Sequence, residues 1–312
     1  MTNPRILSGT AHPALGDAVS EALGTEPVEC EVERFPDGEL QPVIGHVRGE
    51  DVYVVQPTGP KVNGHLVELL LLLDACRRAD AARITAVVPY FGYARQDRRT
   101  RAGQSVGARV ALDALTAAGA NRLVVVDPHN PALEAMSTIP VETLTAVPLL
   151  AHTLAEHAPE AAVLVSPDLG AVKLAERYGA LLGRPVAVVH KTRLSGSDVQ
   201  AEELIGDVAD RPAVIVDDMI STGGTIEAAV QVLLAQGATQ DITVAATHPL
   251  LVQQAPDRLA RLPINLLLVT NTVPPGRVRT LPHRVRSVAP LLAEAIALLH
   301  GGEPLDTLLM RA

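Results

Sequence analysis

The sequence predicts an α/β protein built on parallel sheets. Short apolar runs alternate with longer segments of helical period along the whole 312-residue chain. The runs are apolar at nearly every position, which is typical of strands covered by helices on both faces. The chain exceeds one average domain, and its connections are short. We therefore expect two similar α/β domains, each with a mostly parallel sheet flanked by helices.

The alternation defines the expected elements in chain order. The candidate strands are the apolar, β-rich runs Val52–Val55, Ile84–Val88, Leu123–Val126, Ala162–Val165, Val186–Val189, Ala213–Val216, Ile242–Ala246 and Ile264–Val269. The candidate helices are Val62–Arg78, Val106–Ala118, Val147–His157, Ala171–Leu182, Thr225–Gln236 and Ala289–His300. A linker near Pro140–Val147 is expected to divide residues 1–145 from 146–288, with the C-terminal helix of residues 289–312 packing back onto the first domain.

Composition narrows the function. A formal net charge of −9 argues against general affinity for nucleic acid or for anionic membranes. The most apolar run, Leu66–Leu73, is interrupted by Glu68 and is too short to span a bilayer. Cys30 and Cys76 lie far apart without metal-like spacing, as expected of reduced cysteines in the cytoplasm. The N-terminus lacks an apolar signal core.

The most informative stretch is residues 213–225. A predicted strand ends in two carboxylates, Asp217 and Asp218, and a helix follows after a short loop. Such a loop lies where open α/β sheets bind ligands, and the unpaired N–H groups of the helix N-terminus suit a phosphate. A pair of acids would repel that phosphate unless they bind sugar hydroxyls or a metal beside it, so a phosphorylated sugar is the first ligand to consider. The loop residues are Ser221, Thr222, Gly223, Gly224 and Thr225.

This stretch resembles the phosphoribosyl-pyrophosphate (PRPP) binding motif, which phosphoribosyltransferases share with ribose-phosphate pyrophosphokinases. The resemblance to the pyrophosphokinase family extends along nearly all of the chain. It implies two phosphoribosyltransferase-like domains. It also implies that Asp217 and Asp218 bind the ribose hydroxyls and that the loop binds the 5-phosphate.

Two further segments resemble the ATP-binding loops of that family. One follows the strand 84–88 and concentrates aromatic and basic residues, which suit a base and phosphates. The other is a Pro-Asp-Gly turn. The matching residues are Arg95, Gln96 and Asp97 in the first and Phe35, Asp37, Gly38 and Glu39 in the second. In the family the adenine site crosses a subunit contact, so the resemblance implies a homo-oligomer, with a hexamer favoured.

Two strand ends resemble the family's Mg²⁺ contacts. His129 follows the strand 123–126, with Pro128 in place of the family's usual Leu. Asp168 follows the strand 162–165 in a loop that resembles the family's pyrophosphate loop, with Ala171 in place of a second Gly. The resemblance implies Mg²⁺ as cofactor, with His129 and Asp168 among its contacts.

The segment after strand 186–189 carries two cations at a spacing of two residues. Lys is scarce in this chain, so Lys191 stands out, and Arg193 follows it. Side chains two residues apart in an extended segment lie on one side, from which both can reach one substrate. In the family such a mobile loop carries a catalytic Lys and Arg, and Arg193 would also contact ribose 5-phosphate. Thr192 and His190 depart from the family pattern.

The resemblance implies transfer of the β,γ-pyrophosphoryl group of ATP to the C1 hydroxyl of ribose 5-phosphate, giving PRPP and AMP. Three alternatives share part of the pattern: a phosphoribosyltransferase, a non-catalytic regulatory homologue, and a pyrophosphokinase for another sugar phosphate. The segment that begins at His248 departs from the family's Thr-His-Gly pattern, and the sequence offers no functional account of it.

Overall fold

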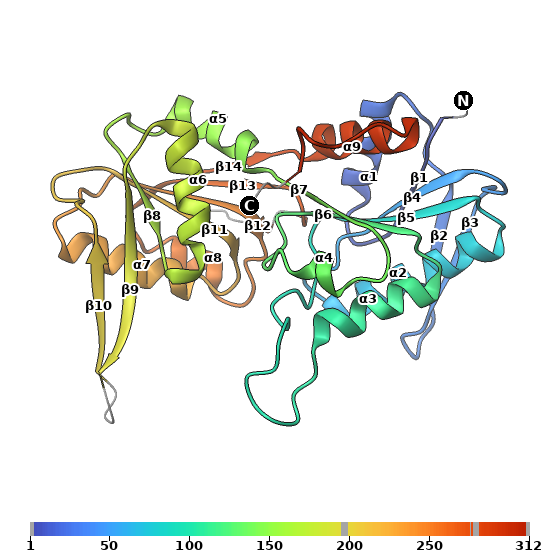
Figure 1. The fold of residues 1–312 in the computed structure, drawn as a ribbon, viewed down its shortest axis with the longest axis horizontal. Helices are drawn as coiled ribbons and strands as arrows, with labels where there is room; N and C mark the ends of the chain where they lie inside the picture. The colour runs from blue at the N-terminus through green and yellow to red at the C-terminus, as the bar shows by residue number, and fades with distance from the viewer. Residues whose placement is uncertain (1–2, 195–198, 275, 277–280, 310–312) are drawn as a thin grey trace. The chain divides into compact units, whose positions relative to one another are not determined.

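The computed structural model describes residues 3–194, 199–274, 276 and 281–309, and for residues 191–194 and 199–202 it describes the backbone course only. The chain divides into two compact units (Figure 1). The N-terminal unit comprises Met1–Thr145, Thr272–Pro274 and Ser287–Ala312, and the C-terminal unit comprises Ala146–Asn271 and Pro275–Arg286. Each unit is described by itself below.

The N-terminal unit is built on a parallel sheet with the strand order β1-β4-β5-β6-β7. Helices α1 and α9 cover one face, and α2 and α3 cover the other (Figure 1). The strands are β1 Arg5–Ser8, β4 Asp51–Val55, β5 Arg83–Val88, β6 Arg122–Val126 and β7 Val141–Leu144. The helices are α1 Pro13–Leu23, α2 Val62–Arg78, α3 Gly107–Ala118, α4 Leu133–Met136 and α9 Ala289–Gly301. An antiparallel hairpin of β2 Cys30–Arg34 and β3 Leu40–Ile44 packs on α2.

The C-terminal unit is built on a larger sheet with the order β10-β9-β8-β11-β12-β13-β14. Strands β9 and β10 pair antiparallel, and the other neighbours pair in parallel. The strands are β8 Val163–Ser166, β9 Val186–Leu194, β10 Val199–Ile205, β11 Ala213–Ile220, β12 Ile242–Pro249, β13 Ile264–Thr270 and β14 His283–Arg286. The helices are α5 Val147–His157, the 3-10 turn η1 Leu169–Ala171, α6 Val172–Leu182, α7 Gly224–Ala235 and α8 Ala255–Leu259.

The first half of the central strand β11, residues 213–216, is apolar at every position, and its packing shows why. Ile215 packs in a core with residues of α7, such as Val230. Val216 enters a second core on the opposite face, with Leu150 of α5. Because successive side chains of a strand point to opposite faces, both faces of this strand must be apolar. The α/β fold class with parallel sheets flanked by helices is confirmed.

The direction of strand succession reverses between β8 and β11. From β8 the chain builds outward to β9 and β10, and from β11 it builds the other way to β14. In open α/β sheets such a reversal point leaves a crevice beyond the carboxyl ends of the two central strands, where ligands bind. The predicted phosphate loop follows β11, and Asp168 follows β8.

Several elements differ from the sequence prediction. Strand β11 continues to Ile220, so Asp217 and Asp218 lie within the strand rather than after it. Strand β9 continues to Leu194 through the segment expected to be a mobile loop. The stretch interpreted as a linker, Pro140–Val147, contains β7. Strands β1, β2, β3, β7, β10 and β14 and helices α1, α4 and α8 were not predicted. No helix in the described parts of the chain is long and apolar enough to cross a membrane.

Candidate active site

The loop Ser221–Gly223 connects β11 to α7 in the C-terminal unit. Gly223 has φ 76° and occupies the N-cap position of α7, a left-handed conformation that glycine adopts without steric cost. Thr222 is exposed. Since a helix leaves its first N–H groups without helical partners, the 12-residue α7 presents donors and a positive dipole end at Gly224 and Thr225.

Asp217 and Asp218 stand on successive positions of β11, and their carboxyl groups are close enough to interact. The backbone N–H of Asp218 donates to Asp217 Oδ1 at 2.8 Å. Burial raises the pKa of Asp217 well above its usual range, and the neighbouring charges of Asp218 and Asp168 add to this effect. Three carboxyl groups therefore surround the reversal point of the sheet. Hydroxyl donors suit this acidic environment, because they add no further negative charge to it.

The loop after β8 is shaped by Asp168. Its Oδ1 accepts hydrogen bonds from the N–H groups of Gly170 at 2.8 Å and Ala171 at 3.2 Å, and Ser166 Oγ donates to the Asp168 carbonyl at 2.6 Å. Both side-chain bonds fall on Oδ1, so the carboxylate retains a second oxygen. Ala171 is buried, so its methyl group is packed within the fold and does not stand exposed over the loop.

In the N-terminal unit, the segment after β5 holds the residues predicted to bind ATP. The Gln96 N–H donates to the Tyr93 carbonyl at 2.8 Å, and the Gln96 carbonyl accepts from Ala108 N–H at 3.2 Å. The main chain at Gln96 is thus fixed, while Arg95 and Gln96 are exposed. Asp97 is more enclosed and pairs with Arg98, whose Nε lies 3.4 Å from Asp97 Oδ1.

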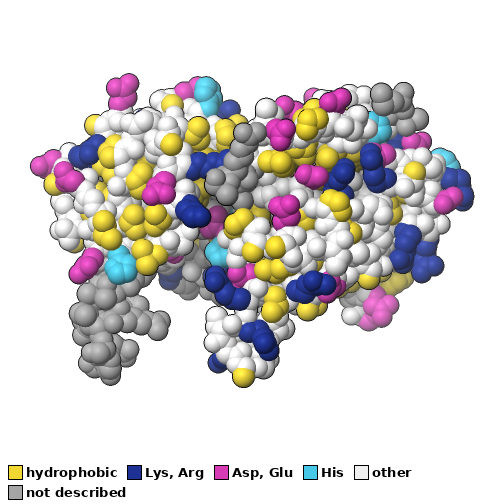
Figure 2. Space-filling model, viewed as in Figure 1, with side chains coloured by type: hydrophobic (Ala, Val, Ile, Leu, Met, Phe, Trp, Pro, Cys, Tyr) yellow, Lys and Arg dark blue, Asp and Glu magenta, His cyan; other side chains and the backbone are white. Residues whose placement is uncertain are grey.

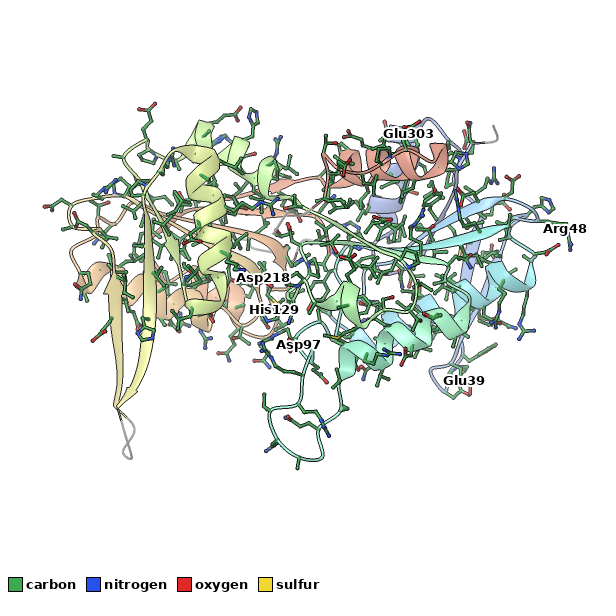
Figure 3. All side chains as sticks on the ribbon, viewed as in Figure 1. Glu39, Arg48, Asp97, His129, Asp218 and Glu303 are labelled. Atoms are coloured by element: carbon green, nitrogen blue, oxygen red, sulfur yellow. The ribbon has the colours of Figure 1, made fainter. Side chains whose placement is uncertain are left out.

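His129 lies in the loop that follows β6, and this loop contacts the previous one. Asn130 Nδ2 donates to Asp97 Oδ2, and Asn130 Oδ1 accepts from Ala132 N–H at 2.9 Å. His129 is exposed, whereas Pro128 before it is buried. Asp97 and His129 therefore lie at the same edge of the sheet, beyond the carboxyl ends of β5 and β6 (Figure 3).

The second predicted ATP loop, Phe35–Glu39, forms the tip of the β2–β3 hairpin. Glu39 O accepts from Phe35 N–H at 2.9 Å, and Asp37 Oδ1 accepts from Glu39 N–H at 3.1 Å. Asp37, Gly38 and Glu39 are exposed. Figure 3 shows Glu39 well apart from Asp97 within this unit. A single N-terminal unit therefore does not bring the two predicted ATP loops together.

Lys191 and Arg193 occupy alternate positions of β9, opposite Glu202 and Gln200 of β10. Positions two apart in a strand share one face, as the sequence predicted. The side chains of Lys191 and Arg193 lie outside the described part of the structure.

One residue of the site was not predicted. Arg258 of α8 donates from Nη1 to the Thr222 carbonyl at 3.0 Å, and its Nε lies 3.1 Å from Glu227 Oε2. Arg258 is 36 residues from Thr222, and no local pattern links the two. Across the described ranges, no group of three or more His, Cys, Asp or Glu side chains is placed to hold a metal ion.

The fold and the site together define the class of protein. The C-terminal unit is an open α/β domain with an acidic pair and a strand-to-helix loop at the reversal point of its sheet, which is where domains of this class bind ligands.

Comparison with known proteins identifies the family. Residues 4–119 match the N-terminal domain of ribose phosphate pyrophosphokinase, and residues 198–311 match the phosphoribosyl synthetase-associated domain. The ribose-phosphate pyrophosphokinase of Caldanaerobacter subterraneus is 41% identical over 96% of this chain and 95% of its own length. That of Gloeobacter violaceus is 43% identical over 95% of this chain and 90% of its own length.

A solved structure gives the same result. The phosphoribosylpyrophosphate synthetase from Mycobacterium smegmatis superimposes with a TM-score of 0.91 at 38% identity, covering 96% of this chain and all of that one. The chain belongs to the ribose-phosphate pyrophosphokinase family. The predicted family and enzyme class are confirmed.

Proposed function

We propose that this chain transfers the β,γ-pyrophosphoryl group of ATP to the C1 hydroxyl of ribose 5-phosphate, giving PRPP and AMP. The observation that carries this proposal is the acidic pair beside an anion-binding loop at the reversal point of the sheet, in a chain that matches pyrophosphokinases over nearly its full length. The reaction is attack at phosphorus, so catalysis consists of positioning and charge stabilisation.

The C-terminal unit holds the sugar phosphate in this mechanism. The N–H groups at Gly224 and Thr225, with the hydroxyls of Ser221 and Thr222, bind the 5-phosphate. Asp218, together with Asp217, accepts hydrogen bonds from the ribose hydroxyls. Burial and the neighbouring carboxyls raise the pKa of Asp217, and hydroxyl groups beside it add no further negative charge.

The N-terminal unit binds the nucleotide. Arg95, Gln96 and Asp97 form one part of the ATP site, and the hairpin tip from Phe35 to Glu39 forms the other. Because the two parts lie apart within one unit (Figure 3), a second copy of the chain supplies one of them. We therefore propose a homo-oligomer, with a hexamer as the favoured state, in which each ATP site needs two subunits.

The residues present fit a sparsely held Mg²⁺ rather than a metal enclosed by protein. Mg²⁺ keeps several waters and binds through one or two carboxylates and substrate phosphates. Asp168 has one carboxylate oxygen beyond its capping bonds, and His129 is exposed at a strand end. These two residues would hold the ion, and the bound ion would offset charge on the phosphate oxygens.

Lys191 and Arg193 supply the remaining positive charge. Their alternate positions on β9 allow both side chains to approach one substrate. In the proposed mechanism they neutralise the charge that develops on the transferred group, and Arg193 also contacts the sugar phosphate.

We place the reaction in the cytoplasm, without nucleic-acid or membrane partners. Burial raises the pKa of Cys30 to about 11 and that of Cys76 to about 12, which keeps both thiols protonated and unreactive. Acidic and basic side chains are interspersed on the face shown in Figure 2, in keeping with the net charge of −9.

The test is AMP formation by the purified protein with ATP and Mg²⁺, with and without ribose 5-phosphate. AMP that appears only with the sugar phosphate, matched by an equal amount of PRPP, supports the proposal. Unphosphorylated ribose is the matched control, because it keeps the attacking hydroxyl and lacks the group that the 221–225 loop would bind. Two results overturn the proposal. The first is AMP formation that occurs only with a different sugar phosphate. The second is the absence of AMP formation by a folded protein that binds ATP.

A further inference from the structure

The segment that follows β12 donates hydrogen bonds to backbone carbonyls at the end of β11 and in the proposed phosphate loop, residues 221–225. This segment, residues 250–258, begins directly after His248-Pro249, whose sequence departs from the family pattern. Three consecutive carbonyls, from the last residue of β11 into the loop, accept hydrogen bonds from this segment. The bonds are Leu251 N–H to Ile220 O at 2.9 Å, Val252 N–H to Ser221 O at 3.0 Å and Arg258 Nη1 to Thr222 O at 3.0 Å.

These bonds fix the direction of the loop's N–H groups. In a trans peptide the carbonyl of one residue and the N–H of the next point in opposite directions. The Thr222–Gly223 peptide is trans, so holding the Thr222 carbonyl against Arg258 turns the Gly223 N–H away from Arg258. The Gly223 carbonyl accepts from Glu227 N–H at 3.0 Å within α7, which turns the Gly224 N–H outward from the helix end. The donors of the loop are thereby directed to the side opposite the segment.

Arg258 is itself held in place. Its Nε lies 3.1 Å from Glu227 Oε2 in the first turn of α7, and the two side chains are 34% and 38% exposed. A Cβ added at Gly224 would lie 3.3 Å from Arg258 Nη1, which is tighter than ordinary van der Waals contact. The guanidinium therefore bridges the loop backbone and the helix that follows it, and it packs closely against Gly224.

We propose that Arg258 is a positioning residue for ribose 5-phosphate binding. It holds the Thr222 carbonyl away from the ligand and so keeps the Gly223 N–H directed toward the 5-phosphate. A rotated peptide would present a carbonyl oxygen to the phosphate, and two negatively polarised groups would face each other. This inference rests on the proposed role of the 221–225 loop and gives the segment after His248 a function.

The test compares Arg258→Gln, Arg258→Lys and Arg261→Gln with the unaltered protein. Arg261→Gln is the matched control, because it removes the same charge at an exposed position three residues further along the chain. Calorimetric titration with ribose 5-phosphate measures affinity, steady-state kinetics give KM for each substrate, and amide hydrogen exchange reports on residues 221–224 without ligand. For Arg258→Gln, we expect the affinity for ribose 5-phosphate to fall about ten- to hundredfold, which is the value of one hydrogen bond to a charged donor.

KM for ATP should not change in Arg258→Gln, and the amides of the unliganded loop should exchange faster. Arg258→Lys should be intermediate, because an ammonium can reach the Thr222 carbonyl but cannot bridge to Glu227 with a planar fork. If Arg258→Gln does not fold, Arg258→Lys carries the test. Wild-type affinity in a folded Arg258 variant, or an equal loss in Arg261→Gln, overturns the positioning role alone. An unaltered protein that does not bind ribose 5-phosphate overturns both this inference and the proposed function.

Discussion

Asp51 lies at the start of β4 and joins three parts of the N-terminal unit. It accepts hydrogen bonds from Arg83 Nε at 2.8 Å and from Arg83 Nη2, from His300 Nδ1 at 2.8 Å, and from Tyr53 Oη at 3.0 Å. Its side chain is 11% exposed. Burial alone would raise the pKa of Asp51, but the hydrogen bonds from Arg83, His300 and Tyr53 outweigh burial and lower it. We predict that Asp51→Asn destabilises this unit.

The expected loss follows from the number and exposure of these bonds. Asparagine keeps the shape of the aspartate side chain. Its NH₂ group would face the hydrogen-bond donors that surround Asp51, and the negative charge would be lost. A hydrogen bond to a charged group contributes about 1.5–3 kcal/mol. Arg83 is 40% exposed, so its two bonds are discounted for solvent screening. Asn also keeps one acceptor oxygen, so only part of these bonds is lost, and we expect Asp51→Asn to lower the free energy of unfolding by about 2–3 kcal/mol.

Asp80→Asn is the matched control. Arg48 Nη1 lies 2.7 Å from Asp80 Oδ2, a distance comparable to those at Asp51, but the two side chains are 67% and 71% exposed. An exposed pair of this kind contributes less than about 1 kcal/mol. Urea unfolding followed by circular dichroism, which does not depend on tryptophan, compares the two variants at pH 7. Equal losses would refute the argument that burial, rather than ion-pair distance, sets the contribution.

The pH dependence gives a second check. Because the pKa of Asp51 is lowered on folding, its contribution is present above its unfolded pKa of about 4 and is lost as the pH falls through the folded value. The difference between the unaltered protein and Asp51→Asn should therefore stay constant from about pH 8 to 5 and narrow below about pH 4. A difference that grows toward acid pH would contradict the assignment.

Three further predictions concern the site. Asp218→Asn should raise KM for ribose 5-phosphate more than KM for ATP, and an equal effect in steady-state kinetics would argue against sugar binding. Lys191→Ala should lower turnover about a hundred- to thousandfold with little change in nucleotide affinity, whereas near-normal turnover would remove its catalytic role. Burial and two neighbouring carboxyls raise the pKa of Asp217, so the fold loses stability as the pH rises above about 4. Asp217→Asn should therefore raise the unfolding midpoint at pH 8 but not at pH 4, and a gain independent of pH would contradict this.

The sequence predicted the buried strands well because their environment constrains every position. Ile215 and Val216 face different cores, so the run 213–216 contains no polar residue. Strands with weaker constraints were missed. Val43 of β3 is 63% exposed, and its pairing with β2 depends on a hairpin whose strands lack a continuous apolar pattern.

The residues of the candidate site also differ in how well the sequence alone could identify them. The acidic pair and the phosphate loop are adjacent in sequence and follow one strand, so a local pattern identifies them. Contacts across the fold leave no such pattern. Asn130 reaches Asp97 over 33 residues and Arg258 reaches Thr222 over 36, and both pairs meet only because parallel strands bring their carboxyl ends to one edge.

Backbone conformations in the left-handed region gather beyond the carboxyl ends of the strands in each of the two sheets. Among the described residues, five of the seven non-glycine residues with positive φ lie in loops that follow the carboxyl ends of β4, β5, β6 and β12. These five are Lys61, Tyr93, Asp127, Leu251 and Gln253. Each such residue costs about 1–2 kcal/mol relative to an ordinary conformation, so the surrounding structure must hold it.

The turn after β12 shows what a strained backbone conformation does in this structure. Leu251 has φ 43°, and its side chain is 9% exposed. The buried side chain fixes the turn, and the turn aims the Leu251 and Val252 N–H groups at the phosphate loop. A glycine at 251 would remove the strain but also the anchor, and it would let the turn sample other conformations. The strained residue in this turn thus belongs to a backbone whose polar groups are directed before any ligand binds. Polar groups that are preorganised in this way stabilise charge most effectively.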